Sequence, residues 1–216
     1  MSDSSSAGVP PAGFRSRRDG ISTRNRGHQP HWESPVATYF VTFRLADSLS
    51  HEELQRILFS RKDIPATAKQ MARGITEAEQ KRLSKLRAPS IEKYLDAGAG
   101  ACFLRNAVVA NIVPDSLRQF DGKRYELFAW CVMPNHVHVV FRATVGNTLA
   151  RILHSWKSFS AKRANKFLHR TGEFWQREYY DRLIRDEAEF YRAIQYVVDN
   201  PRKAGLIGWQ WAWPPR

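Results

Sequence analysis

Two histidines that stand one residue apart, His136 and His138, are the first residues whose type and spacing could do chemistry. They lie in the stretch "MPNHVHVVF" (133–141), whose β-branched and aromatic residues favour a strand. Alternate side chains of an extended chain point to the same face, so both imidazoles would project together. The pair is therefore either two polar side chains on a strand that faces water or two ligands of one metal ion.

A metal ion held by two imidazoles needs a further ligand from elsewhere in the chain. The stretch "QYVVDN" (195–200) places Tyr196 and Asn200 four residues apart, and such residues share one face of a helix. An amide oxygen from Asn200 would complete a site of two imidazoles and one carbonyl with open positions, which suits Mg²⁺ or Mn²⁺ holding a phosphate. Tyr196 would then stand beside that phosphate as a nucleophile, and its attack would leave a covalent phosphotyrosine.

The other tyrosines nearby fit that role less well. Tyr179 and Tyr180 precede the helix cap at Asp186, so we expect them on a strand. Tyr191 is nine residues from Asn200, about 900° of helical rotation, which puts it on the opposite side of the helix. Helix geometry thus favours Tyr196.

Composition indicates the class of partner. The chain of 216 residues has 34 Lys and Arg against 21 Asp and Glu, a formal charge of +13, which favours a polyanion such as nucleic acid. Two cysteines make no disulfide framework and lack the spacing of a zinc site. With no apolar run long enough for a membrane span and no secretory signal, we expect a single cytoplasmic domain, associated with the nucleoid and not with a membrane.

The elements that must position these residues follow from hydrophobic periodicity. Strands are predicted at 38–45, 124–133, 136–141 and within 173–184, and the second and third of them form a hairpin. Helices are predicted at 51–60, over roughly 91–120 with an interruption at Pro114, at 147–170, and from Asp186 to Asn200. This order predicts an α+β fold of the ferredoxin-like or RRM-like kind, a split βαββαβ antiparallel sheet with helices on one face and an extra C-terminal helix that bears the nucleophile.

Two segments fall outside this pattern. Residues 1–34 are rich in Ser, Gly, Pro and Arg and are predicted to be a disordered basic arm before a catalytic domain at 35–216. Residues 61–89 read as an exposed basic insertion. At the other end, the alternating tryptophans of "GWQWAWPPR" (208–216) either pack back onto the domain or stack on bases.

The helix predicted at 147–170 carries six cations and no acidic residue. One interpretation is an ordinary solvated face, and the other is a surface that contacts DNA phosphates. The second gives the DNA-binding candidates Lys157, Lys162, Arg163, Lys166 and Arg170.

The motif "WCVMPNHVHVVF" closely resembles the His-hydrophobic-His (HUH) motif of single-tyrosine transposases. The segment "FWQREYYDRLIRDEAEFYRAIQYVVDNPRKAGL" resembles the tyrosine-bearing end of one subgroup, the REP-associated tyrosine transposases, and "TYFVTFRL" and "IEKYLDAGAGACFLRN" are also similar to that subgroup. Together these segments span roughly 35–213.

The resemblance implies a ferredoxin-like fold, a divalent cation at His136 and His138, and Tyr196 as nucleophile on single-stranded DNA. It also implies nicking at hairpins of repetitive extragenic palindromes, with the 5′ phosphate kept on tyrosine and a 3′ hydroxyl released. The phosphotyrosine conserves the bond energy, so no nucleotide cofactor such as ATP is needed. The protein would act as a monomer or homodimer.

Two other functions remain open from the sequence. An RRM-like binding module would read single strands with aromatic side chains and need no metal. A metal-dependent hydrolase would cleave with activated water and leave no protein–DNA adduct. The presence of the histidine pair together with Tyr196 favours the transposase.

Overall fold

The computed structural model describes residues 22–26, 29–33, 36–48, 76 and 98–214. Its helices are the short 3₁₀ helix η1 and three α-helices, and its strands fall into a two-stranded ribbon and a five-stranded sheet. The helices are η1 (Phe103–Arg105), α4 (Ala107–Arg118), α5 (Leu149–Phe167) and α6 (Glu187–Lys203). The strands are β1 (Ser22–Arg26), β2 (Gln29–Glu33), β3 (Thr38–Arg44), β4 (Tyr125–Val132), β5 (His136–Ala143), β6 (Tyr180–Leu183) and β7 (Ala212–Trp213).

The main sheet has the strand order β6-β3-β5-β4-β7, and every pair in it is antiparallel. Four of these strands, together with α4 and α5, follow the chain as β3, α4, β4, β5, α5, β6. This is the split βαββαβ arrangement that the sequence predicts. The strand that carries both histidines, β5, lies at the centre of the sheet.

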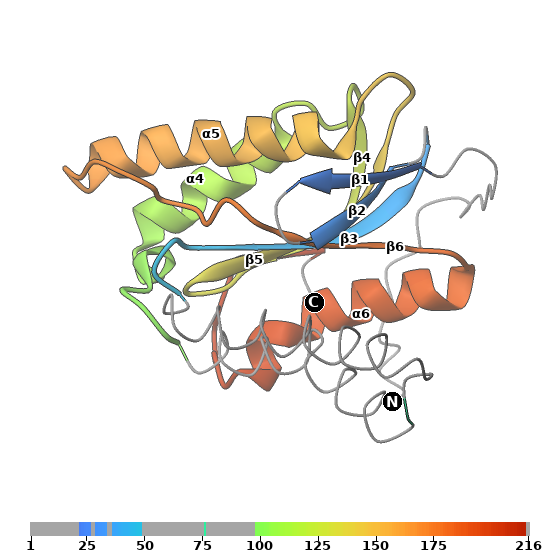
Figure 1. The fold of residues 1–216 in the computed structure, drawn as a ribbon. Coiled ribbons are helices and arrows are strands. Elements are labelled where there is room, and N and C mark those ends of the chain that lie inside the picture. Colours follow the sequence, from blue (N-terminus) through green and yellow to red (C-terminus); the bar gives the residue numbers. More distant parts are fainter. Residues whose placement is uncertain (1–21, 27–28, 34–35, 49–75, 77–97, 215–216) are drawn as a thin grey trace, which may run out of the picture.

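Strand alternation sends the two sides of β5 into two separate cores. Val137, Val139 and Phe141 belong to the larger apolar cluster, which includes the buried faces of α4 and α5. Val140 belongs to a smaller cluster built with α6. Accordingly α4 and α5 cover one face of the sheet, as expected, and α6 covers the opposite face (Figure 1). The face under α6 is also the face of His136 and His138.

Side-chain caps begin the helices, and the cap of α6 at Asp186 is the one expected from the sequence. Asn106 accepts from two backbone N–H groups at the start of α4, and at α6 Asp186 accepts from the Glu189 N–H while Glu189 accepts from the Arg185 N–H. The expected interruption at Pro114 and the expected end at Asn200 are both wrong. Pro114 lies inside α4, and Pro201 lies inside α6, which continues to Lys203. Both proline rings are buried, so packing offsets the single helical N–H donor that each lacks.

Part of the N-terminal segment, residues 22–26 and 29–33, is described in the structure. Strands β1 and β2 pair as an antiparallel ribbon within it. Residues 1–21, the helix expected at 51–60 and, apart from Thr76, the insertion expected at 61–89 lie outside the described residues.

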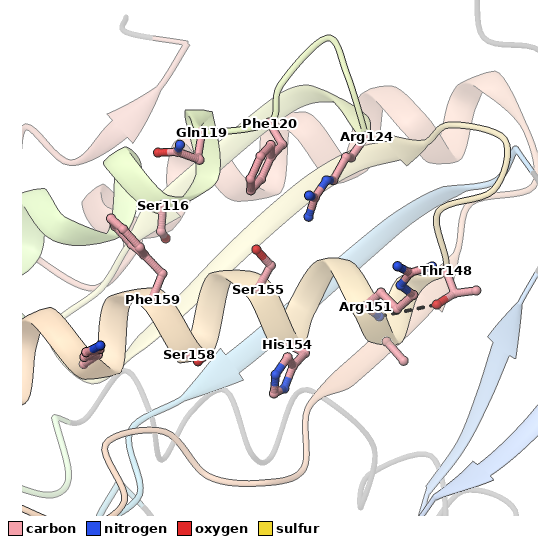
Figure 2. A pocket seen from close by; sticks show the side chains of 12 residues that line it. Ser116, Gln119, Phe120, Arg124, Thr148, Arg151, His154, Ser155, Ser158 and Phe159 are labelled. Carbon is pink, nitrogen blue, oxygen red and sulfur yellow. Dashed lines mark hydrogen bonds between the residues drawn. The ribbon is translucent and has the colours of Figure 1, made fainter.

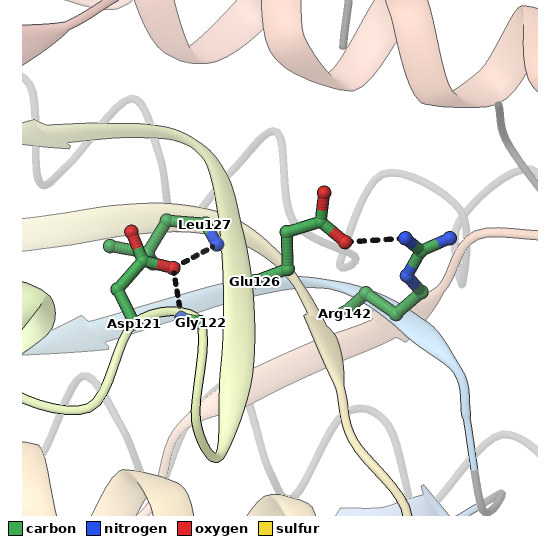
Figure 3. Close-up of polar contacts among 5 residues, drawn as sticks. All are labelled: Asp121, Gly122, Glu126, Leu127 and Arg142. Atoms are coloured by element: carbon green, nitrogen blue, oxygen red, sulfur yellow. Dashed lines mark hydrogen bonds and ion pairs between the residues drawn. The ribbon is translucent and has the colours of Figure 1, made fainter. Parts of the chain in front are cut away.

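The Asp121 side chain fixes the turn that precedes β4 through hydrogen bonds to the backbone. Asp121 Oδ1 accepts from the backbone N–H groups of Gly122 (3.0 Å) and Leu127 (2.9 Å), and the register of β4 against β5 shifts just after Leu127 (Figure 3). A bulge of this kind bends and twists a strand locally. Glu126 on β4 stands opposite Arg142 on β5, and the two side chains form an ion pair.

The tryptophan-rich tail packs back onto the domain. Strand β7 pairs with β4, Trp209 Nε1 donates to the Val132 carbonyl (2.6 Å), and Trp211 Nε1 donates to Asn111 Oδ1 (2.8 Å). The two cysteines, Cys102 and Cys131, are free and buried. Within the described ranges, no helix has both the length and the apolar character needed to cross a bilayer.

Candidate active site

His136 and His138 meet on the central strand. Both side chains are fully buried, and their Nε2 atoms lie 3.0 Å apart. The rings stand almost perpendicular to each other, with centroids 4.7 Å apart. The expectation that the two imidazoles project together is therefore confirmed, and the alternative of a strand face against water is wrong.

The opposite nitrogen of each ring is held by a neighbour. His136 Nδ1 lies 2.7 Å from Asn135 Oδ1, and His138 Nδ1 lies 2.7 Å from Thr42 Oγ1. Asn135 is itself oriented, because its amide donates to the Ala99 carbonyl. When each Nδ1–H donates to its partner, both Nε2 lone pairs face the same space.

Burial keeps the two imidazoles neutral. It lowers the pKa of His138 from 6.5 to about 3. It also lowers the pKa of His136 well below its usual value, with smaller contributions from His138 and the Arg44 guanidinium. Neutral imidazole is the form that binds a metal ion.

The residues at this point fit a hexacoordinate divalent cation. Nitrogen ligands in adjacent positions of an octahedral site with bonds of about 2.1 Å lie about 3.0 Å apart, and this is the separation found here. The described residues contain no group of three His, Cys, Asp or Glu side chains that could hold a metal. A third ligand would therefore be a neutral oxygen. Asn200 Oδ1 is buried and has no hydrogen-bond partner in the described structure, so it has the chemistry of such a ligand.

Helix α6 brings Tyr196 to the histidines. The Tyr196 ring lies edge-on to His138, with centroids 5.4 Å apart, and edge-on to Phe40 at 5.7 Å. The Lys203 ammonium lies 5.5 Å from the centre of the same ring. Asn200 follows Tyr196 by one turn of α6, so the shared helix face predicted from their spacing is present.

The remaining tyrosines are placed differently. Tyr191 is 42% exposed and contacts the Phe190 ring. Tyr180 begins β6, as expected for a strand residue, and lies 6.5 Å from the Phe40 ring. Tyr179 precedes the strand. Of these three, Tyr180 packs against the cluster on the α6 face of the sheet. It is therefore the main alternative to Tyr196 as the nucleophile, and periodicity alone could not show this.

Arg44 is a site residue that the sequence did not single out. It stands directly opposite His136 in the β3–β5 register, is only 6% exposed, and donates from Nε to Gln176 Oε1. Burial lowers the pKa of Arg44 to about 10, although the Glu178 carboxylate opposes that effect. The guanidinium is therefore a buried cation beside the histidine pair. Only the strand register reveals it, because 92 residues separate Arg44 from His136.

The five cations expected to contact DNA share α5 and the turn after it, but they are not equivalent. Lys157 points inward and donates to the carbonyls of Gln176 and Arg177. Arg163 lies 3.8 Å from Asp115, and the Arg170 guanidinium stacks over Phe103 at 4.5 Å. Lys162 and Lys166 are exposed. Because α5 and α6 lie on opposite faces of the sheet, these cations do not surround Tyr196 (Figure 1).

Sequence comparison links the chain to transposases. Residues 109–200 match the family described as "Transposase IS200 like". The "Putative REP-associated tyrosine transposase" of Haemophilus influenzae is 26% identical over 100 residues, 42% of this chain and 57% of that protein. The "REP-associated tyrosine transposase" of Escherichia coli K12 is 25% identical over 92 residues, 42% of this chain and 52% of that protein. The matched segments span about half the length of these curated relatives.

One solved structure is similar over most of the chain. It is a REP-associated tyrosine transposase bound to a REP hairpin, with a TM-score of 0.44 and 16% sequence identity. The alignment covers 88% of this chain and 81% of that one.

Proposed function

Because residues 109–200 match the family of IS200-like transposases, we propose that this chain nicks and rejoins single-stranded DNA with Tyr196 as the nucleophile. One observation carries the proposal. The buried imidazoles of His136 and His138 converge on one point, and the Tyr196 ring lies against His138 at 5.4 Å. A nucleophile beside a candidate cation site is the arrangement that phosphoryl transfer to a side chain requires.

The proposed reaction is a transesterification. Tyr196 Oη attacks the phosphorus of a phosphodiester, so that an Oη–P bond forms and the bond from phosphorus to the 3′ oxygen breaks. The proton of the phenol leaves, and the departing 3′ oxygen takes up a proton to become a hydroxyl. The 5′ end stays on tyrosine. A second 3′ hydroxyl reverses these steps and reseals the strand, so no nucleotide cofactor is consumed.

His136, His138 and the Asn200 amide oxygen would hold the divalent cation, Mg²⁺ or Mn²⁺. When bound, it would polarise the scissile phosphate and orient it in line with the phenol. Thr42 and Asn135 keep the imidazoles in the required orientation through their Nδ1 atoms.

Two further side chains suit an anionic substrate. The buried Arg44 guanidinium stands beside His136 and would attract a phosphate entering the site. The Lys203 ammonium, near the Tyr196 ring, would favour the negative charge that develops on the phenol oxygen during attack. Both roles use charges that the fold fixes in place.

We further propose that the DNA substrate is a hairpin of repetitive extragenic palindromes. The proposal rests on the likeness to the REP-associated relatives and on the net charge of +13, which favours a polyanion. On this proposal the protein acts on DNA of the nucleoid, as a monomer or a homodimer.

The test is formation of a denaturation-resistant protein–DNA adduct with a repeat-hairpin oligonucleotide and Mn²⁺. Wild-type protein should form the adduct, and Tyr196→Phe should bind the hairpin without forming it. Tyr180→Phe and Tyr191→Phe are the matched controls and should retain adduct formation. An adduct from Tyr196→Phe, or its loss from Tyr180→Phe, would show that the nucleophile is misassigned.

The same assay separates the alternatives. A non-catalytic module of RRM-like fold would bind single strands without cleavage, and a water-activating hydrolase would cleave without an adduct. Changing either histidine to alanine should abolish adduct formation while most hairpin binding persists. Asn200→Ala should impair the reaction less, because water can replace a neutral amide ligand.

A further inference from the structure

A groove of about 880 Å³ lies between α4 and α5, on the side of the sheet away from Tyr196. Its volume is in the range of about 300–1,000 Å³ that is usual for ligand sites. Figure 2 shows Phe120 and Arg124, from the segment after α4, directed toward Ser155 on α5. The wall therefore combines two elements, and neither contributes to the candidate active site.

The charge of the groove is one-sided. Arg124, Arg151 and Lys162 line it, together with His154, and none of the described lining residues is acidic. Ser155 and Ser158 add hydroxyl groups. Such a lining fits a ligand with several negative charges and hydrogen-bond acceptors, which describes a phosphodiester backbone.

Aromatic rings in the groove are paired with guanidinium groups. The Arg124 guanidinium lies 3.7 Å from the centre of the Phe120 ring. Phe159 is 39% exposed, and Arg163 lies 5.4 Å from the centre of its ring. Flat aromatic and guanidinium surfaces next to cations bind nucleic acids by stacking on bases that are not already stacked in a duplex.

We propose that this groove binds unpaired nucleotides of the DNA substrate, with phosphates on Arg124, Arg151 and Lys162 and a base on Phe159. The identity of the ligand as DNA rests on the proposed function, whereas the groove and its charge do not. Only an unpaired strand can offer a free base face to Phe159. The groove would therefore hold a single-stranded segment of the substrate while the sheet separates that segment from Tyr196.

The first experiment measures affinity with the full chain. Fluorescence anisotropy would follow binding of a labelled single-stranded oligonucleotide to Arg124→Gln and Phe159→Ala. We expect Phe159→Ala to weaken binding by about fivefold or more. Arg124→Gln should also weaken binding and should reduce the slope of log affinity against log salt by about 0.7.

Each variant has a matched control. Lys123→Gln removes the same charge next to Arg124, but Lys123 does not line the groove. Phe167→Ala removes a comparably exposed ring, 43% against 39%, from the same helix outside the groove. Both controls should bind DNA as the wild type does. Equal losses in the variants and their controls, or wild-type binding by Arg124→Gln and Phe159→Ala, would overturn the proposal.

A second measurement reports the stacking directly. An oligonucleotide that carries 2-aminopurine should lose fluorescence on binding to wild-type protein and to Phe167→Ala, and lose less on binding to Phe159→Ala. Equal quenching by all three proteins would contradict base stacking on Phe159.

Failure of this proposal and failure of the proposed function give different results. The binding assays can be done with Tyr196→Phe protein, because binding is measured without DNA cleavage. If the groove is not a binding site, the wild type still forms the adduct while Arg124→Gln binds DNA normally. If the nicking function is wrong, no adduct forms, and the groove variants still bind DNA more weakly than their controls.

Discussion

The imidazoles of His136 and His138 are buried polar groups whose protonation the fold opposes. Both pKa values are lowered by burial, that of His138 to about 3, whereas an unfolded histidine titrates near 6.5. Below pH 6.5 the unfolded chain therefore binds protons that the folded chain does not. Stability is fully present above that pH and decreases as the pH falls toward 3.

This gives a first prediction, for protein freed of metal with a chelator. His138 should contribute a slope of up to about 1.4 kcal/mol of unfolding free energy per pH unit between pH 6.5 and pH 4, and His136 should add a contribution in the same direction. His138→Leu should remove one such contribution. Urea unfolding at several pH values measures the slope, and an unchanged slope in His138→Leu would mean that His138 titrates normally in the folded state.

A second prediction concerns Arg44. Its positive charge stands beside the candidate cation site, so Arg44→Gln should bind Mn²⁺ about tenfold more tightly if a repulsion of about 1.4 kcal/mol is removed. The same variant should form the adduct more slowly, because the phosphate loses a cationic partner. Arg44→Lys should stay close to wild type in both respects.

Calorimetric titration with Mn²⁺ and adduct kinetics are the two measurements. Arg192→Gln, which removes an exposed charge from α6, is the control for net charge. A purely structural role for Arg44 would weaken metal binding and slow adduct formation together, and that joint loss would contradict the prediction.

Helix α5 carries cations with different roles. Lys162 and Lys166 are exposed, whereas Lys157 donates to two backbone carbonyls of the segment before β6. Replacing Lys162 and Lys166 together by alanine should reduce the salt slope of DNA binding by about 0.7 to 0.9 for each lost contact. Lys157→Ala should leave that slope unchanged.

Lys157→Ala should instead lower the free energy of unfolding by about 1 kcal/mol or more, since it removes hydrogen bonds from a charged donor. Salt titrations of DNA affinity and urea unfolding separate the two effects. A wild-type salt slope in the Lys162 and Lys166 double variant would exclude this part of α5 from the interface.

Local signals in the sequence were enough to predict most elements but not their pairings. The alternating "HVHVVF" predicts β5, and the cap at Asp186 predicts the start of α6. The missing N–H of Pro201 predicts an end of α6 at Asn200, but the buried proline ring packs within the helix, which continues to Lys203. Arg44 and Thr42 became site residues only through the β3–β5 register, which brings together positions that are remote in the chain. The groove beside Arg124 depends on how α4 packs against α5, and no local pattern encodes that.

The central sheet separates two sets of residues. The α6 face carries the histidines and Tyr196, and the other face carries the groove and the exposed lysines of α5 (Figure 1). Variants on the second face should therefore change DNA affinity, whereas variants on the first should change the chemical step.

A last prediction concerns the contribution of the C-terminal tail to stability. Trp209→Phe and Trp211→Phe keep an aromatic ring but lose the indole N–H bonds to Val132 and Asn111. The Val132 residue is fully buried, so its carbonyl would lose a partner that water replaces poorly, whereas Asn111 is exposed. Trp209→Phe should lower the free energy of unfolding by about 1 kcal/mol, and more than Trp211→Phe. Thermal and urea unfolding measure both, and a larger loss in Trp211→Phe would contradict this ranking.

The central position of β5 bears on how quickly the protein's backbone opens. The strand is hydrogen-bonded to β3 on one side and β4 on the other, so its amide protons should exchange with solvent only when the whole domain unfolds. A metal ion that binds only the folded protein raises the free energy of unfolding, so the metal-bound protein should take up deuterium in β5 even more slowly than the metal-free protein. The two imidazoles lose their conformational entropy when the chain folds. Binding of the ion therefore does not have to order them, because both nitrogen atoms are already in place.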